Sequence, residues 1–466
     1  MRNKFILFIV FITFQSVNAQ AIEKIGEEFL QNFHNKKYDV CTTYLDASIL
    51  TQLNEKTLQE IQSQLTLQIG DFIKINSHKK DVINGKKSIV YHTDFSRSKI
   101  DIRLTFSEKD KIIGFFFTPS SESNKVFPQT PKPPFDYPSE EVNFINPIDG
   151  NTLAGTLCLP EKWTFQTPLY VLITGSGAQN RDSEIYGHKP FAVIADYLAK
   201  NNIASLRLDD RGIGGSSPGK NTDTSENFAT DITAAFHFLE GRGFTNIGLI
   251  GHSEGGAIAA MVAAKEEKIR NIILLAAPGL PGNELLILQN KRILEVSGVS
   301  PEQIKEDLKL KSYFFNFVRT YKGNQFAEDA HKALNNFFIE NKNTDSKKAQ
   351  ELISHRLIQQ TNPWMVYFLK STPTEYLKQL KIPVLALNGS LDTQVTAKEN
   401  LEAIRKALLQ AENKAVEMVE IPGLNHLFQT AKSGSPSEYE EIEETFSPKV
   451  LELIKNWVHK HQKTYT

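Results

Sequence analysis

The chain has 466 residues, with 53 Lys and Arg against 54 Asp and Glu, so its formal net charge is -1. This balance gives no electrostatic reason to expect nucleic acid or an anionic membrane as a partner. The length allows two or three domains, and a hydrophobic fraction of 40% is typical of a globular protein. The two cysteines, Cys41 and Cys158, are expected to be free, buried thiols, with a disulfide as the alternative in an oxidising compartment. No Cys/His cluster has metal-ligand spacing, so we expect no metal.

The N-terminus, residues 1–19, has the pattern of an export signal. Two basic residues precede an apolar run over 5–14, and small residues end at Ala19, where cleavage is expected. The apolar run is well short of the roughly 20 residues that a membrane span needs. We therefore expect the mature protein to begin at Gln20 and to occur in the periplasm or the extracellular medium, without a membrane anchor.

Residues 20–119 predict a small α+β domain. Apolar residues recur at helical spacing between 22 and 33, and a second helical stretch covers 55–67. Strand-like segments follow at 72–77, 88–95, 100–106 and 112–117. Two helices followed by an antiparallel sheet resemble, in outline, the cone-shaped domains related to nuclear transport factor 2. Binding of a partner or substrate and a purely structural accessory role both stay open for this domain.

A linker over 120–138 is predicted next, because its prolines favour an extended, semi-rigid spacer. Residues 139–466 then alternate short apolar strands with helices, the pattern of a mostly parallel sheet covered on both faces. The expected strands are 141–145, 153–159, 170–174, 203–208, 247–250, 272–276, 384–387 and 415–421. From 279 to 380 the alternation stops, and helical, aromatic-rich sequence predicts a cap inserted over the C-terminal edge of the sheet.

The hexapeptide GHSEGG at 251–256 follows a predicted strand and precedes a helix of small residues. Ser253 therefore has a glycine two positions away on each side, which is the G-x-S-x-G pattern of a nucleophile elbow. A serine on such a sharp turn has a strained backbone, and side chains at the glycine positions would collide with the neighbouring strand and helix. The pattern predicts Ser253 as a nucleophile.

A serine hydroxyl needs a base to take its proton and an acid to hold that base. Asp392 follows one predicted strand and His426 follows the last one, so both would come from loops at the sheet edge that carries Ser253. They also occur in the chain order Ser, Asp, His that such a sheet uses. We therefore predict Ser253, His426 and Asp392 as a catalytic triad, and we expect His252 to point away from the nucleophile.

Backbone N–H groups must also stabilise the oxyanion that forms when an acyl carbonyl is attacked. One donor is expected to be the amide of Glu254, the residue after the nucleophile. The other is expected to be the amide of Ser176, with Gly177 as the alternative, in the glycine-containing loop after the strand at 170–174. The loop DDRGIGGS at 209–216 is interpreted as a structural turn with an internal ion pair.

From about residue 141 to its end, the chain resembles bacterial α/β-hydrolase esterases whose oxyanion loop reads Gly-Ser-Gly-x-x-x-Arg-Asp. The matching segments are GSGAQNRD at 175–182, RLDDRG at 207–212, GHSEGG at 251–256, PW at 363–364, NGSLD at 388–392 and GLNH at 423–426. The resemblance implies an α/β-hydrolase fold with a helical cap, preceded by the small α+β domain, and it implies Ser253, Asp392 and His426 as catalytic residues. Thr174 departs from the pattern, because relatives often have histidine at this position.

The resemblance implies a secreted serine esterase that cleaves small-molecule carboxylic esters through an acyl-enzyme, without a cofactor. A serine peptidase of the aminopeptidase or prolyl-peptidase type on the same scaffold stays open, because it would differ in the leaving group. A catalytically silent binding protein on a hydrolase fold is the third hypothesis. No pattern in the sequence indicates the oligomeric state.

The predicted cap is rich in aromatic residues, at 314, 315, 317, 337, 338, 364, 367 and 368. Helical spacing alone would bury most of them in the core of the cap. Trp364 is expected to face the substrate, because the break at Pro363 favours a loop position over the elbow. An apolar roof would favour an acyl chain, each buried methylene contributing about 0.8 kcal/mol.

Overall fold

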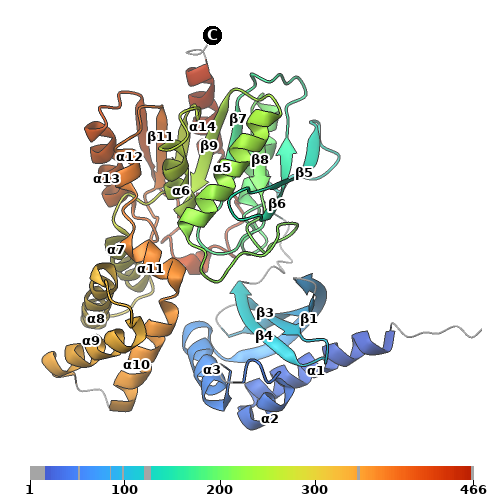
Figure 1. Cartoon of the computed structure of the whole chain (residues 1–466), viewed down its shortest axis with the longest axis vertical. Helices are drawn as coiled ribbons and strands as arrows, with labels where there is room; N and C mark the ends of the chain where they lie inside the picture. The colour runs from blue at the N-terminus through green and yellow to red at the C-terminus, as the bar shows by residue number, and fades with distance from the viewer. Residues whose placement is uncertain are drawn as a thin grey trace, which may run out of the picture. The chain divides into compact units, whose positions relative to one another are not determined.

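The computed structural model of the chain describes residues 16–50, 53–83, 86–96, 99–119, 127–343 and 347–462. The chain divides into two compact units between residues 124 and 125 (Figure 1). Residues 1–15, which hold most of the predicted export signal, lie outside the described part of the chain. Within the described part, every helix is too short or too polar to cross a membrane.

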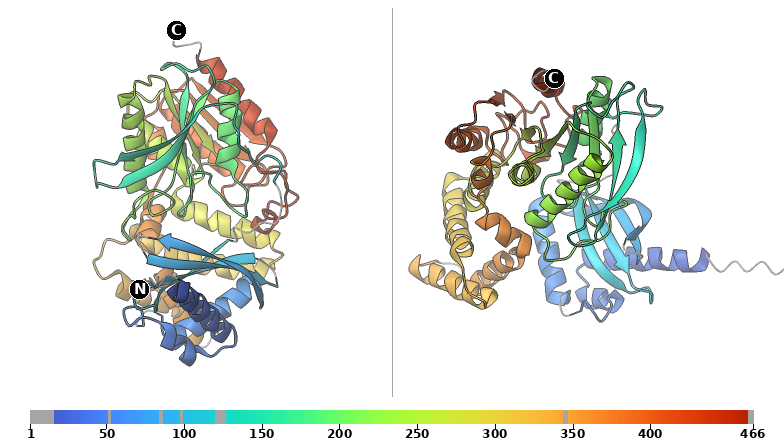
Figure 2. Two further views of the ribbon diagram at one scale, coloured as in Figure 1. Left: turned by 90° about the vertical axis from the view of Figure 1, so that its right-hand side faces the viewer. Right: turned by 45° about the horizontal axis from the view of Figure 1, so that its top comes forward.

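The N-terminal unit is an antiparallel sheet with three helices on one of its faces (Figure 2). Its elements are α1 (Ser16–His34), α2 (Tyr38–Tyr44), α3 (Glu55–Ile69), β1 (Phe72–Ile83), β2 (Lys86–Phe95), β3 (Lys99–Phe106) and β4 (Ile112–Pro119). The strands pair in chain order, and Phe29 and Phe33 of α1 are fully buried in one cluster with Ile102 and Leu104 of β3. The sequence predicts the four strands and the two longer helices, whereas α2 is too short for a periodic pattern.

The second unit is built on an eight-stranded sheet in the order β12-β11-β10-β9-β7-β8-β6-β5. Six strands are parallel: β7 (Leu169–Ile173), β8 (Ala204–Leu208), β9 (Ile247–His252), β10 (Ile272–Leu275), β11 (Val384–Gly389) and β12 (Val416–Ile421). The other two form an antiparallel hairpin at one edge, β5 (Ser139–Ile145) and β6 (Thr152–Cys158). The predicted fold class, a mostly parallel α/β-hydrolase sheet, is confirmed. Cys158 on β6 and Cys41 on α2 are free and buried, as the sequence predicts.

Helices cover both faces of this sheet, as Figures 1 and 2 show. One face carries α5 (Ser225–Gly241), α6 (Glu254–Ala263) and α13 (Ala397–Gln410), and the other carries α4 (Pro190–Lys200) and α14 (Pro448–Gln462). Successive strand residues point to opposite faces, so Val171 of β7 joins the first apolar cluster and Leu172 joins the second. All five residues of β7 are buried, which explains why the strand reads as a continuous apolar run.

The predicted cap is a set of helices between β10 and β11. They are α7 (Gly282–Val296), α8 (Pro301–Thr320), α9 (Phe326–Glu340), α10 (Lys347–Gln360) and α11 (Pro363–Lys370), and the short α12 (Thr374–Leu377) leads back to the sheet. The two connections of the cap meet, because the amide of Gly282 donates to the carbonyl oxygen of Ser371 at 3.1 Å. A Cβ at Gly282 would lie 1.8 Å from the carbonyl oxygen of Phe368, so this junction requires glycine.

Residues 127–138 pack on the hydrolase unit, although the sequence predicts them as part of a spacer. The buried ring of Phe127 lies on His188, with ring centroids 3.7 Å apart. Gln129 donates through Nε2 to the carbonyl oxygen of Phe446 at 2.7 Å and accepts from the amide of Thr445 at 2.6 Å. The side chains of Phe127 and Gln129 therefore hold this segment against the hydrolase unit, although its prolines alone favour an extended spacer.

This docking predicts how the hydrolase unit responds to truncation. A shortened chain that begins at residue 125 should be more stable than one that begins at residue 139, because only the longer one keeps Phe127 and Gln129. Loss of the buried Phe127 ring alone should cost about 1.5–3 kcal/mol of unfolding free energy. Urea unfolding of the two shortened chains measures the difference, and equal midpoints with equal slopes would contradict the prediction.

Candidate active site

Ser253 lies on the sharp turn between β9 and α6, with φ 53° and ψ -124°. A non-glycine residue in this region of φ and ψ is strained, and such strain is typical of functional turns. A Cβ at Gly251 would lie 2.1 Å from the carbonyl oxygen of Gly255, and a Cβ at Gly255 would lie 2.3 Å from that of Ile173. Both flanking positions therefore require glycine, for the steric reason that the sequence pattern predicts.

His426 and Asp392 form a buried pair at the carboxyl ends of β12 and β11. His426 Nδ1 lies 2.8 Å from Asp392 Oδ2. The other carboxylate oxygen, Oδ1, accepts the amides of Gln394 and Val395, each at 2.8 Å. Because a carboxylate accepts, the imidazole proton lies on Nδ1, and Nε2 is the nitrogen left to act as a base.

His252, next to Ser253, links the elbow to the His426 loop. Its Nε2 donates to the carbonyl oxygen of His426 at 2.9 Å, and the two ring centroids are 4.8 Å apart. Burial lowers the pKa of His252 to about 3, so the ring is neutral at ordinary pH. The ring of His252 is thus engaged with the backbone, and the loop that carries His426 is held beside the elbow.

The loop after β7 also meets the elbow. A Cβ at Gly175 would lie 3.2 Å from the Cβ of Ser253, and the next residues, Ser176 and Gly177, are exposed. Glu254 is the first residue of α6, so its amide is one of the N–H groups that a helix leaves without an internal partner. The three amides predicted as oxyanion donors therefore belong to two turns that meet at Ser253.

The side chain of Glu254 connects the elbow to the cap. Its buried carboxylate accepts from Ser225 Oγ at 2.5 Å and from Trp364 Nε1 at 2.9 Å, both through Oε1. Trp364 lies in the first turn of the short helix α11, not in a loop as the sequence predicts, because Pro363 is the first residue of this helix instead of a break. The bond places the predicted pocket residue Trp364 against the residue that follows Ser253, a contact that no sequence motif indicates.

A cavity of about 290 Å³ lies beside these turns. Gly175, Gly177, Glu254 and Trp364 line it, which places it next to the elbow. Part of its wall is apolar and comes from the sheet and from helices α5 and α6: Leu153, Ile173, Leu208, Phe228, Ile232 and Ile258. The polar part of the wall consists of Thr174, Asp209, Asp210, Arg211, Asp231 and Asn362. Most of the cap aromatics instead pack against one another in the core of the cap, because helical spacing buries them there.

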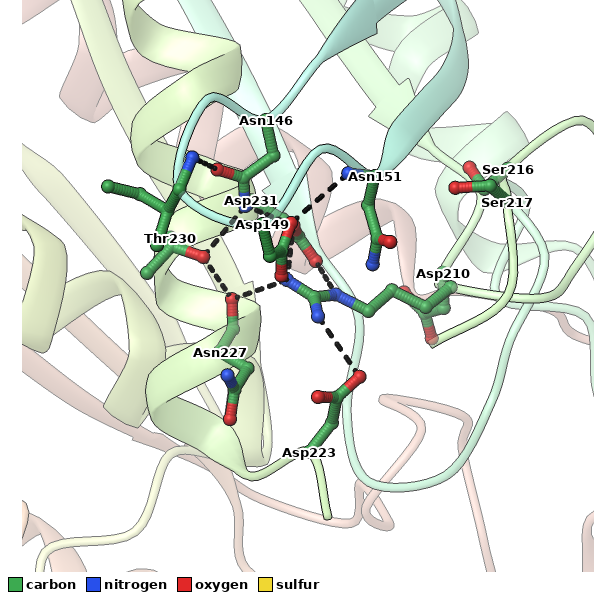
Figure 3. Close-up of polar contacts among 12 residues, drawn as sticks. Asn146, Asp149, Asn151, Asp210, Ser216, Ser217, Asp223, Asn227, Thr230 and Asp231 are labelled. Atoms are coloured by element: carbon green, nitrogen blue, oxygen red, sulfur yellow. Dashed lines mark hydrogen bonds and ion pairs between the residues drawn. The ribbon is translucent and has the colours of Figure 1, made fainter. Parts of the chain in front are cut away.

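Figure 3 shows the cluster of polar side chains around the guanidinium of Arg211. Arg211 and Asp231 of this cluster also line the cavity. The guanidinium contacts three carboxylates: Asp149 at 2.7 Å, Asp223 at 3.0 Å and Asp231 at 2.6 Å. Asp209 pairs with Arg181, at 2.7 Å, rather than with Arg211. The loop 209–216 is thus a structural turn, but its ion pairs reach outside it, because the long Arg211 side chain extends to α5 and to the turn before β6.

Residues 170–430 match the family described as alpha/beta hydrolase fold, and residues 26–115 match a family described as a protein of unknown function (DUF3887). The chain is 24% identical to esterase EstD of Thermotoga maritima over 436 residues, which cover 93% of this chain and 94% of that protein. Among solved structures, it is similar to a Pyrococcus furiosus esterase, with 14% identity, a TM-score of 0.41 and coverage of 70% of this chain and 92% of that one. It is also similar to a Mycobacterium smegmatis proline iminopeptidase, with 13% identity, a TM-score of 0.44 and coverage of 70% and 100%. Because the first family match covers more than half of the chain, the chain belongs to the α/β-hydrolase fold family.

Proposed function

We propose that the protein is a serine esterase that cleaves carboxylic esters with Ser253, His426 and Asp392. The observation that supports this proposal most is the buried pair of Asp392 and His426, 2.8 Å apart, beside a strained serine. The carbonyl oxygen of His426 accepts a hydrogen bond from His252, the residue before that serine. Nucleophile, base and orienting acid thus come from three turns at one edge of the sheet. The near full-length relative, named an esterase, supports the same class of reaction.

In the proposed mechanism, Ser253 Oγ attacks the acyl carbonyl while Nε2 of His426 takes its proton. The imidazolium that forms is stabilised by the Asp392 carboxylate. The amides of Glu254 and Ser176, with Gly177 as the alternative to Ser176, donate to the oxyanion. His426 then protonates the leaving alcohol, and water repeats the sequence on the acyl-enzyme to release the acid and free Ser253.

The wall of the cavity supports an apolar acyl group as the part of the substrate that enters it. Its apolar side chains come from rigid elements of the sheet and its covering helices, which makes a preformed site. Trp364 closes one side and is oriented by its bond to Glu254, so we propose it as a substrate-binding residue. A small or medium acyl chain suits the apolar part of this wall better than a peptide backbone does, because a peptide needs several polar partners there.

The peptidase alternative needs carboxylates that hold a free amino terminus. Four carboxyl groups line the cavity, those of Asp209, Asp210, Asp231 and Glu254. Asp209 is paired with Arg181 and Asp231 with Arg211. Asp210 uses both oxygens for protein donors, Thr174 Oγ1 at 2.7 Å and the Gln179 amide at 2.8 Å. The Oε1 atom of Glu254 already accepts two bonds. These hydrogen bonds to protein donors favour an ester over a substrate with a free ammonium group.

A substrate series tests this choice. On p-nitrophenyl esters of increasing acyl length, kcat/KM should rise about fourfold per methylene until the cavity is full, which corresponds to roughly 0.8 kcal/mol for each methylene buried. Aminoacyl and prolyl p-nitroanilides, assayed on the same preparation, should be cleaved far more slowly. Amides with a higher kcat/KM than every ester would overturn the ester assignment in favour of the peptidase.

A fluorophosphonate probe tests the remaining alternative, a silent binding protein. The probe reacts covalently with an activated serine, so mass spectrometry of the labelled wild type should find the adduct on Ser253. A wild type that neither reacts with the probe nor hydrolyses any ester would contradict the proposed function altogether.

We also propose that the protein is exported. The support is the N-terminal pattern of a basic segment, an apolar run and small residues that end at Ala19. N-terminal sequencing of the protein from its native cells should find Gln20, or a residue close to it, at the start of the mature chain. Functional protein in the cytoplasm with an intact Met1 would contradict this proposal.

A further inference from the structure

One carboxylate holds both ends of the loop that carries the proposed oxyanion donors. Asp210 Oδ1 accepts from the hydroxyl of Thr174 at 2.7 Å, and Oδ2 accepts from the amide of Gln179 at 2.8 Å. The amide of Asp210 also donates to the carbonyl oxygen of Gln179 at 3.0 Å. The four residues between these anchors, 175–178, include Ser176 and Gly177.

The loop depends on these anchors, because packing holds its tip weakly. Ser176, Gly177 and Ala178 are exposed, and no atom lies within 4 Å of a Cβ built at Gly177, whose φ is 92°. Gln179 reaches back through Nε2 to the carbonyl oxygen of Ser176 at 3.3 Å. In a planar trans peptide this carbonyl and the following N–H point in opposite directions, so the bond also orients the amide of Gly177.

Asp210 differs in its partners from the carboxylates of the neighbouring cluster. Asp209 faces Arg181, and the carboxylates labelled around the guanidinium in Figure 3 face Arg211, whereas Asp210 lies to one side. Its two bonds come from neutral donors, and burial raises the pKa of Asp210 to about 7. Burying an acid there without a cation is costly, and such acids are frequent at functional sites.

We propose that Asp210 is a positioning residue that sets the oxyanion loop against Ser253. This inference rests on the proposed serine-esterase mechanism. Transition-state donors are effective only when their geometry is preset, and a displacement of 1 Å costs about 100-fold in rate. Asp210 therefore acts through the amides of residues 176 and 177 and needs no contact with the substrate.

Alanine and asparagine at position 210 make the test. Asp210→Ala removes both side-chain anchors and keeps only the backbone bond to Gln179. We expect kcat for a p-nitrophenyl ester to fall about 10- to 100-fold with KM changed less than about threefold. Asp210→Asn should recover to within about fivefold of the wild type. Its amide oxygen accepts from Gln179 while its N–H donates to Thr174 Oγ1, whose hydroxyl rotates to suit. Thr174→Val, which removes one anchor only, should fall between the two.

Affinity for a boronic acid separates positioning from a general structural role. A boronic acid forms a tetrahedral adduct on the nucleophilic serine, so its inhibition constant should weaken in Asp210→Ala by about the same factor as kcat/KM. Asp223→Ala is the matched control, because Asp223 is a buried carboxylate beside Arg211 that lies outside the cavity wall. Its kcat should stay within about twofold of the wild type, whatever happens to its thermal midpoint.

Three results would overturn the inference. The first is a raised KM with unchanged kcat in Asp210→Ala, which would mean that Asp210 binds the substrate rather than positions the oxyanion loop. The second is an Asn variant as slow as the Ala variant, and the third is a boronate affinity that does not follow kcat/KM. An active wild type with any of these leaves the serine-esterase proposal intact, whereas a wild type inert to both esters and the fluorophosphonate probe overturns both.

Discussion

Replacing Ser253 with alanine should lower kcat for ester hydrolysis by about 10⁴- to 10⁶-fold, the range seen when a serine hydrolase loses its nucleophile. The alanine has no oxygen to form the acyl-enzyme, so the burst of product in pre-steady-state kinetics should also disappear. Substrate affinity should persist, because the cavity wall and the oxyanion loop are untouched. Stopped-flow measurement with a p-nitrophenyl ester gives the burst amplitude and the steady-state rate on one sample.

Ser205→Ala is the matched control for the nucleophile variant. Ser205 is a fully buried serine on β8, and its hydroxyl has no hydrogen-bond partner in the described part of the chain. Its loss should therefore leave both kcat and the thermal midpoint near their wild-type values, since a buried hydroxyl without a partner contributes no stability. A Ser253→Ala protein that kept more than about a tenth of wild-type kcat would exclude Ser253 as the nucleophile.

Asp392→Asn should lower kcat about 10⁴-fold while leaving the fold intact. The asparagine oxygen still accepts the amides of Gln394 and Val395, so the loop keeps its shape. The new N–H₂ group faces His426 Nδ1, which must then accept, and the ring proton moves to Nε2. A protonated Nε2 has no lone pair with which to take the serine proton.

The rate of fluorophosphonate labelling checks the Asp392 prediction independently of turnover. Labelling of Ser253 needs the same proton transfer to Nε2, so its rate should fall with kcat in Asp392→Asn, while the thermal midpoint changes by only a few degrees. Rapid labelling combined with slow turnover would contradict the tautomer argument. It would place the defect in a step after acyl-enzyme formation.

The sheet and the elbow could be predicted because their causes are local. A strand buried on both faces is a short apolar run, as at 169–173, and Gly251 and Gly255 are required by backbone atoms within a few residues or on the neighbouring strand. The positions of Asp392 and His426 follow from the same rule, since both come directly after parallel strands. The fold and the arrangement of the candidate triad residues can therefore be predicted from short stretches of sequence.

The contacts that the sequence does not predict join segments far apart in the chain. Arg211 is paired with Asp149 and Asp231, which lie on either side of it in sequence and on different elements. Trp364 reaches Glu254 across 110 residues, and Gln129 reaches Phe446 across 317. The hydrophobic periodicity of a sequence does not predict such pairs, because each pair depends on where two elements meet after folding.

The junction at Gly282 has a consequence for how enzymes of this architecture diversify. The chain leaves the sheet for the cap and returns from it at nearly the same point, where Gly282 contacts the backbone of Phe368 and Ser371. Because the two ends of the insertion are adjacent, a longer or shorter segment could replace it without changing the register between β10 and β11. Exchange of residues 283–370 would therefore alter the side of the cavity that Trp364 lines, without altering the sequence of the elbow or of the loops after β11 and β12.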